Sequence, residues 1–254
     1  MRAVKDFQLS MKGYRKDPSV LPFSLYSSNK PSVWKHYSDL YPALAARLTK
    51  GRVKWGTHEA SDVSTRLDSL AQATRSSPQG EACLTLEQIQ LARDWKMIRN
   101  RVRPSWDEPD KIPPAQAVKS TKEAFELLGR GEWKEAMKTM TETSRSTNLH
   151  GIGPATASIL LALRDPGVPF FGEEIIRVAL PNAGMSYKYS FTEFEDFYDV
   201  MKEKEEEIGS SEMGVYEMER AVVSGERVVW LHARLRDFNF PFLSSPLLLP
   251  SSLF

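Results

Sequence analysis

The residues with the clearest chemical meaning form a glycine-framed string at 149–157, Leu-His-Gly-Ile-Gly-Pro-Ala-Thr-Ala. Gly151 and Gly153 flank Ile152, and glycine both tolerates positive φ and lets a ligand approach the backbone closely. Pro154 suits the first position of a helix, where its missing N–H has no intrahelical partner. A helix starting here would present free N–H groups and a partial positive charge to an anion. The alternative is a helix–helix turn in which the glycines serve close packing alone.

A second group of residues that could bind phosphate lies at 93–103. Five of its side chains are basic, and one residue, Asp94, is acidic. Four of them recur at spacings of 3, 3 and 4 and therefore share one helical face: Arg93, Lys96, Arg99 and Arg103. Arg101 adds charge on another side. Such a patch can neutralise several backbone phosphates of a nucleic acid, whereas the ordinary explanation of a charge run is a solvated helix face.

The composition limits the classes of protein to which the chain can belong. Its 254 residues suffice to bury a sizeable core, and the net charge of +1 gives no overall polybasic character. The single cysteine, Cys83, excludes an internal disulfide framework, a four-cysteine iron–sulfur cluster and a cysteine-based zinc finger, and it favours a reducing, intracellular compartment. No segment approaches the roughly 20 apolar residues that span a bilayer. A contact with nucleic acid must therefore rest on a local patch.

The elements that position these residues are predicted to be helices. Residues 1–30 are polar and broken by Pro18 and Pro22, and they should form an irregular arm, after which a helix begins near Pro31. Residues 57–80 are rich in Ser, Thr and Gln, and we expect a mobile loop there. The chain is therefore divided into a region at 1–84 that packs on the body and a helical domain at 85–254.

Capping boxes are expected to open three helices of the second region, at Thr85–Gln88, Ser120–Glu123 and Thr192–Glu195. Further helices are predicted at 132–143, 215–223 and 226–235. The segment that follows Pro154 is apolar nearly all round and should be buried. The acidic run at 203–207 is expected to be solvated and to face away from DNA. Since no strand alternation and no internal repeat occurs, the fold class is predicted to be all-α.

The string at 149–157 resembles the helix-hairpin-helix motif of the DNA-glycosylase-like superfamily, which reads Leu-Pro-Gly-Val-Gly-x-Lys-Thr-Ala. The resemblance implies a helical, nuclear protein that docks on the phosphate backbone of DNA through the turn and the basic helix. The residues so implied are Gly151, Ile152, Gly153, Ala155, Thr156, Lys96, Arg99, Arg101 and Arg103. The Schiff-base lysine of the bifunctional members falls on Ala155 here, which excludes a lyase step through that position.

A closer resemblance, over 84–174, is to a eukaryotic family with three signatures: Trp-Lys-x-x-Arg-Gly…Arg-Pro, Gly-Val-Gly-Pro-Ala-Thr-Ala-Ser, and Pro-Phe-hydrophobic-small-Asp-Glu. Their counterparts here begin at Trp95, Gly151 and Pro169. Two positions depart from the pattern, because Asn100 replaces a glycine and Glu173 replaces the aspartate.

Two neighbouring glutamates are the candidate catalytic residues. In glycosylases of this superfamily, an aspartate about twenty residues beyond the turn stabilises the cationic sugar or orients the attacking water. The same count reaches Glu174, while the acidic pair of the closer family points to Glu173. The extra methylene of glutamate displaces the carboxylate by more than about an ångström, which affects positioning. The alternative is that both are first-turn acids favoured by the helix dipole.

Three functions follow from these features. The preferred hypothesis is a monofunctional, metal-independent DNA N-glycosylase-like protein, with a flipped base held by Phe170, Phe171 or Trp106. The first alternative is a helix-hairpin-helix DNA-binding module without catalysis, serving a repair or chromatin complex. The second is a helical protein-interaction scaffold. We predict no cofactor, the one exception left open being a monovalent cation at the hairpin turn, and no membrane partner.

Overall fold

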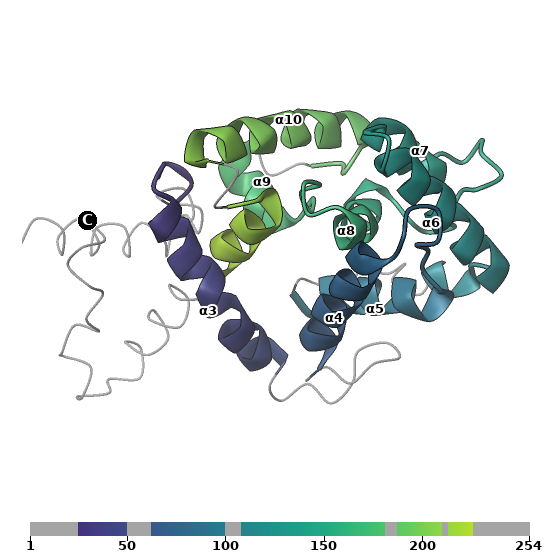
Figure 1. Cartoon of the computed structure of the whole chain (residues 1–254), viewed down its shortest axis with the longest axis horizontal. Helices are drawn as coiled ribbons and strands as arrows, with labels where there is room; N and C mark the ends of the chain where they lie inside the picture. The colour runs from purple at the N-terminus through teal and green to yellow at the C-terminus, as the bar shows by residue number, and fades with distance from the viewer. Residues whose placement is uncertain (1–24, 50–61, 100–107, 181–186, 210–212, 226–254) are drawn as a thin grey trace, which may run out of the picture.

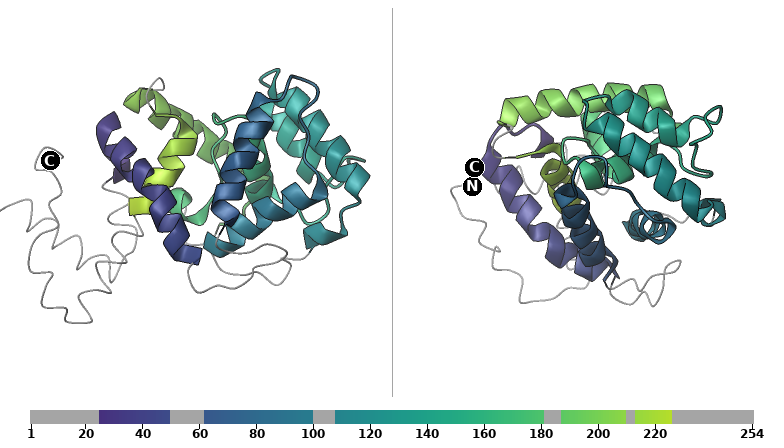
Figure 2. Two further views of the ribbon diagram at one scale, coloured as in Figure 1. Left: turned by 60° about the horizontal axis from the view of Figure 1, so that its bottom comes forward. Right: turned by 45° about the vertical axis from the view of Figure 1, so that its right-hand side comes forward.

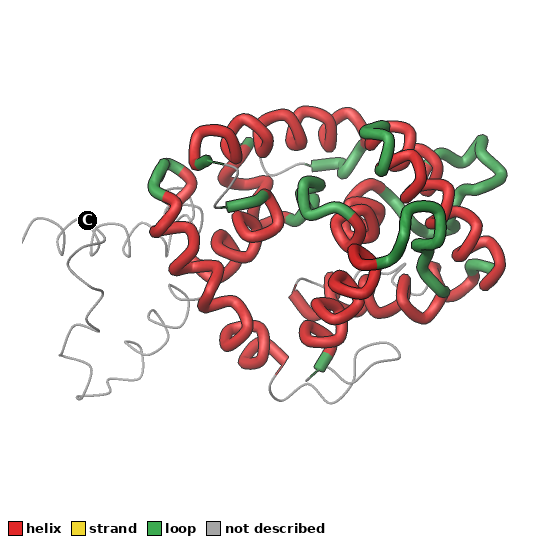
Figure 3. The backbone as a smooth tube through the Cα atoms, viewed as in Figure 1, coloured by secondary structure: helices red, strands yellow, loops and turns green. Residues whose placement is uncertain are grey.

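The computed structural model describes residues 25–49, 62–99, 108–180, 187–209 and 213–225. All regular structure in these ranges is helical, without a strand, which confirms the all-α class. The α-helices are α3 (Pro31–Thr49), α4 (Val63–Ser76), α5 (Leu86–Arg99), α6 (Pro114–Leu128), α7 (Trp133–Thr141), α8 (Pro154–Arg164), α9 (Glu173–Ala179) and α10 (Phe191–Ile208). A 3₁₀ helix, η1 (Glu108–Lys111), precedes α6, and residues 215–225 form a last helix. Loops of varied length connect these helices (Figure 3).

Helix α8 lies among the other helices, where it contacts α4, α5, α6, α7 and α10 (Figure 1). All its residues from 155 to 163 are buried, which confirms the prediction from their apolar character. A helix that is apolar on every side is stable only when other elements cover all its faces. The start of α8, at Pro154, is therefore held in place by the core that surrounds the rest of the helix.

The last described helix, 215–225, lies beside α3, as both views in Figure 2 show. Its Arg220 joins two earlier helices, because the guanidinium contacts Asp68 of α4 at 2.6 Å and lies 4.7 Å from the ring centroid of Tyr41 in α3. Tyr216 donates a further hydrogen bond to Asp68 at 2.9 Å. These contacts tie the two ends of the described chain together.

Helix α4 corrects the prediction of a mobile loop at 57–80. Residues 63–76 are helical, and their buried side chains recur at spacings of 4, 4 and 3: Val63, Leu67, Ala71 and Thr74. This stripe packs on α5 and α8. The side chains are small and widely spaced among polar residues, so local composition favours a loop. Only the tertiary contacts supply enough burial to hold the helix.

The predicted helix starts have mixed outcomes. The box at Thr85 is confirmed, since Gln88 accepts from the Thr85 N–H at 2.8 Å and Thr85 accepts from the Gln88 N–H at 3.3 Å. The box at Ser120 is wrong, because α6 already begins at Pro114 and Ser120 lies buried inside it, donating to the carbonyl of Thr147. Proline in the first turn is a start signal in its own right.

The start and the acidic run of α10 also differ from expectation. The capping box is formed by Ser190 and Glu193, two residues before the predicted pair. The run at 203–207 is not fully solvated, since Lys204 and Glu205 are buried. Lys204 donates to Asn29 at 2.6 Å, and Glu205 accepts from the backbone N–H of Val215 at 3.3 Å. The run therefore anchors neighbouring segments through these buried polar contacts.

Candidate anion-binding site

The hairpin turn is a tight backbone structure that requires glycine at one position. Gly151 has φ +74°, and a Cβ at this residue would lie 2.5 Å from the Cβ of Glu108 in η1. Both facts favour glycine, which has no side chain to clash and adopts positive φ readily. Ile152 is buried, as expected for the residue that plugs the turn into the core. The turn thus packs on η1 while both of its glycines stay exposed.

The first turn of α8 begins at Gly153, the N-cap residue, with φ −96° and ψ 176°. Its carbonyl accepts from the N–H groups of Thr156 and Ala157, both at 2.9 Å. Within the described part of the chain, the N–H groups of Gly153 and Ala155 donate to no hydrogen-bond acceptor. No atom of that part lies within 4 Å of a Cβ built on Gly153. Free amides and open space at a helix start are the conditions under which an anion binds.

Lys96 of α5 reaches this helix start from a different element. Its Nζ donates to Thr156 Oγ1 at 2.9 Å, and Thr156 lies in the first turn of α8. The ammonium group therefore lies beside the positive end of the helix dipole. Two features that the sequence indicates separately, the basic helix and the glycine turn, meet at this contact.

Arg93 corrects the prediction of a continuous phosphate-binding face on α5. Its side chain is 2% exposed and forms ion pairs with Asp94 at 2.7 Å and with Asp110 of η1. These carboxylates neutralise a charge that the helical spacing alone assigned to the surface. Of the other predicted basic residues, Arg99 ends α5 without a described side chain, and Arg101 and Arg103 lie outside the described residues.

A cavity of about 210 Å³ opens in front of α8. Its walls come from α5, from Pro109 of η1, from the turn and first residues of α8, and from residues 188–189 ahead of α10. Lys188 and Tyr189 are wall residues that the sequence analysis missed. No local pattern distinguishes them, because their place at the cavity depends on how the chain returns from α9 to α10.

Beside the turn lies a small charged cluster of Glu108, Lys111 and His150. Glu108 accepts from Lys111 at 2.7 Å and hydrogen-bonds the exposed ring of His150. These two hydrogen bonds hold the pKa of Glu108 below its usual range. The Lys111 ammonium offsets this negative charge near the turn.

The two candidate catalytic glutamates lie at the start of α9, and neither lines the cavity. Glu173 is exposed and pairs with Arg177 at 3.2 Å, one turn further along the helix. Glu174 is 2% exposed and points into the interior. The exposed residue therefore fits the role of a first-turn acid favoured by the helix dipole, whereas the buried one does not.

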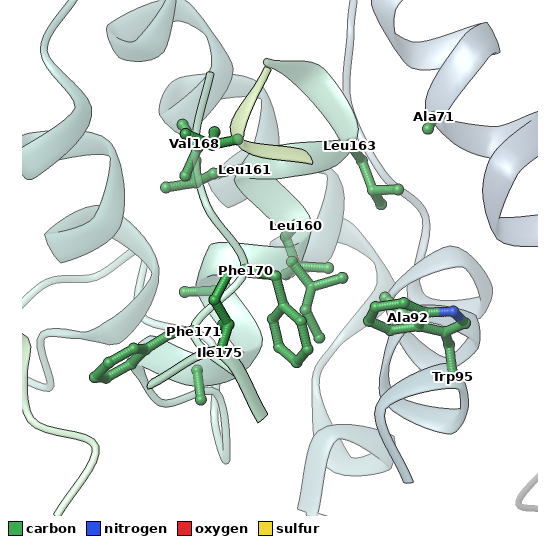
Figure 4. Packing of buried hydrophobic residues seen from close by; sticks show 14 of the residues in the cluster. Ala71, Ala92, Trp95, Leu160, Leu161, Leu163, Val168, Phe170, Phe171 and Ile175 are labelled. Carbon is green, nitrogen blue, oxygen red and sulfur yellow. The ribbon is translucent and has the colours of Figure 1, made fainter. Parts of the chain in front are cut away.

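Two of the three aromatic residues proposed for a base pocket, Phe170 and Phe171, are core residues. Phe170 packs against Trp95 with 5.2 Å between ring centroids, and Phe171 is fully buried (Figure 4). Phe171 contacts the rings of Phe194 and Phe197 at 5.4 and 5.2 Å. Neither phenylalanine lines the cavity. The third candidate, Trp106, lies outside the described residues.

Within the described ranges, no group of His, Cys, Asp and Glu side chains is arranged to hold a metal ion. In the same ranges, no helix has the length and apolar character needed to cross a membrane. No protein-family model, curated protein or solved structure matches the chain. The resemblance to helix-hairpin-helix glycosylases therefore rests on the sequence motifs alone.

Proposed function

We propose that the chain binds DNA through its phosphate backbone, at the cavity in front of α8. The observation that carries the proposal is the contact between Lys96 and Thr156, which joins the basic helix to the first turn of α8. An anion in the cavity would be reached by this ammonium and by the N–H groups of Gly153 and Ala155. Hydrogen bonds to charged groups are shorter and stronger than neutral ones, which favours a phosphate oxygen as acceptor.

The exposed glycine at position 153 supports the same ligand. A phosphate group is bulky, and it approaches a helix start most closely where no Cβ stands in front of the amides. Within the described part of the chain, no atom fills the space beside Gly153. The motif resemblance to helix-hairpin-helix proteins, which use this turn on DNA, points in the same direction.

The proposal is tested by fluorescence anisotropy of a labelled DNA duplex titrated with the full chain at low salt. Lys96→Ala should weaken binding about tenfold, since a hydrogen bond to a charged group contributes roughly 1.5–3 kcal/mol. Lys134→Ala is the matched control, because it removes the same charge from an exposed lysine of α7 that does not line the cavity. Absence of binding at low salt would overturn the proposal and favour a protein-interaction scaffold.

A second candidate, hydrolysis of an N-glycosidic bond, is favoured by the burial of Glu174. Removing a carboxylate from water is costly, so a buried glutamate in the first turn of a helix calls for a specific role. In the glycosylases that the motif resembles, an aspartate at the corresponding position stabilises the sugar cation or orients water. We propose this activity second to DNA binding, because the cavity is not lined by either glutamate.

Base release from a panel of damaged duplexes tests this second candidate. Glu174→Gln should abolish release while Glu173→Gln, which alters an exposed pair with Arg177, should retain it. The melting temperature of Glu174→Gln separates a structural role of the residue from a chemical one. Activity that survives both substitutions would contradict the assignment, and so would inactivity of the unaltered chain on every lesion.

A further inference from the structure

We propose, on the basis of the DNA binding argued above, that the cavity holds one unstacked nucleotide of a DNA strand, with Tyr189 against its sugar or base. The preferred ligand is then single-stranded or gapped DNA rather than an uninterrupted duplex. Three observations carry the step: the backbone conformation of Tyr189, the support of its ring, and the size of the cavity.

Tyr189 is the one non-glycine residue with positive φ, +55°, in the described part of the chain. Residues with a Cβ rarely adopt this backbone conformation. Those that do are held in it by the surrounding structure, and they cluster at functional sites. Both flanks of Tyr189 are fixed by hydrogen bonds. The Tyr187 hydroxyl donates to the carbonyl of Leu180 at 2.8 Å, and Ser190 forms the capping box with Glu193.

The ring of Tyr189 is held by the core on one side. It meets Phe171 edge to face with 5.5 Å between centroids, and Phe171 is itself locked between the aromatic rings of α10. Tyr189 is half-buried and lines the cavity together with the residues that start α8. A supported aromatic side chain beside a phosphate site is the arrangement on which unpaired bases stack.

The cavity is larger than one phosphate group requires. It measures about 210 Å³, whereas about 10–15 Å³ of such space holds one water. Lys96 and Lys188 lie on its wall, so that a phosphate and the adjoining sugar or base fit the chemistry of the lining. A nucleotide inside a stacked duplex enters such a cavity only after it is unpaired and unstacked, at a cost of about a few kcal/mol that an already unpaired nucleotide does not incur.

The test compares three labelled ligands of the same sequence: a single strand, an intact duplex and a duplex with a one-nucleotide gap. The full chain should bind the single strand and the gapped duplex more tightly than the intact duplex. Tyr189→Asn removes the ring but suits the left-handed backbone, so the turn is retained. This variant should bind the single strand about tenfold more weakly and the intact duplex unchanged, while Tyr189→Phe should behave as the unaltered chain.

The outcomes separate this inference from the function on which it rests. If Lys96→Ala weakens binding but all three ligands bind alike and Tyr189→Asn has no effect, the nucleotide site is wrong and phosphate binding stands. If no ligand binds at low salt, both are wrong. Because the comparison of the three ligands uses the unaltered chain, it decides the question even where a variant fails to fold.

Discussion

The two glycines of the hairpin turn have different surroundings. Substitution of Gly151 should therefore affect mainly the stability of the fold, and substitution of Gly153 mainly the affinity for DNA. Gly151→Ala should destabilise the fold by about 1–2 kcal/mol or more, because Gly151 has positive φ and an added Cβ meets Glu108. Denaturant unfolding measures this loss. An unchanged midpoint would show that the turn is not packed on η1 as described.

Gly153→Ala should have the opposite profile. Its φ of −96° suits alanine and no described atom obstructs the methyl group, so the cost in stability should stay within about 1 kcal/mol. The methyl group would stand in front of the free amides and reduce DNA affinity by about tenfold or more. Anisotropy and unfolding measured on the same preparation check both halves. Full affinity in this variant would mean that the phosphate does not approach the helix start.

Single side chains also show where sequence reasoning about the site ends. Helical spacing assigns Arg93 and Lys96 to one face, and both do border the cavity. Spacing does not reveal that Asp110, seventeen residues further on, folds back to neutralise Arg93. The chemistry of Lys96 could be predicted from the sequence, whereas its contact with Thr156, sixty residues away, depends on the packing of α5 against α8.

At the scale of helices, the start of α10 gives a direct test of cap assignment. Ser190→Ala should cost about 1 kcal/mol because it removes the side chain that accepts from the Glu193 N–H. Thr192→Ala, at the position favoured by the sequence pattern, should change stability by less than about 0.5 kcal/mol. Thermal unfolding of the two variants distinguishes them. Equal losses would contradict the observed cap.

The same cap predicts a dependence on pH. Burial alone would raise the pKa of Glu193, but hydrogen bonds from the backbone N–H groups of Ser190 and Lys188 outweigh it and hold the pKa below its usual value. A carboxylate with a lowered folded-state pKa stabilises the fold fully above its unfolded pKa, about 4.3, and loses this contribution as the pH falls through the lowered value. In Glu193→Gln, the free energy of unfolding should therefore fall less steeply as the pH is lowered below about 5. Unfolding free energies that fall equally steeply with decreasing pH in the unaltered chain and in this variant would contradict the role of Glu193.

Helices differ in how far the sequence predicts them. The α8 segment is apolar on all sides and α5 carries both a capping box and an apolar stripe, so local patterns suffice for both. Helix α4 was missed because its stripe is made of smaller side chains whose burial exists only against α5 and α8. Residues 188–189 were missed for a related reason, since no periodic signal marks a loop that completes a cavity wall.

For the molecule as a whole, the central helix should govern stability without touching the ligand. Leu160 of α8 is fully buried and does not line the cavity. Leu160→Ala should cost about 2–5 kcal/mol, with a fall in melting temperature of roughly 2–4 °C per kcal/mol, and the folded fraction should keep its DNA affinity. Val118→Ala, at an exposed apolar residue, should stay within about 0.5 kcal/mol and serves as the control. A Leu160→Ala protein of unaltered stability would contradict the central position of α8.

The net charge of the whole chain bears on the proposed binding of DNA at the start of α8. With a net charge of only +1, the molecule has no general attraction to nucleic acid, so the proposed binding rests on a local site, which we place at the start of α8. Lys111 pairs with Glu108, whereas Arg93 is shared by two carboxylates, those of Asp94 and Asp110. Lys96 and Lys188 line the cavity beside the positive end of the helix dipole.

The salt dependence of duplex binding tests this claim most directly. The logarithm of the association constant falls linearly with the logarithm of salt concentration, by about 0.9 for each B-DNA phosphate neutralised. If Lys96 contacts a phosphate, Lys96→Ala should reduce the magnitude of this slope by about 1, while Lys134→Ala should leave it unchanged. A slope that is the same in the unaltered chain and in Lys96→Ala would show that DNA does not meet the protein at the start of α8.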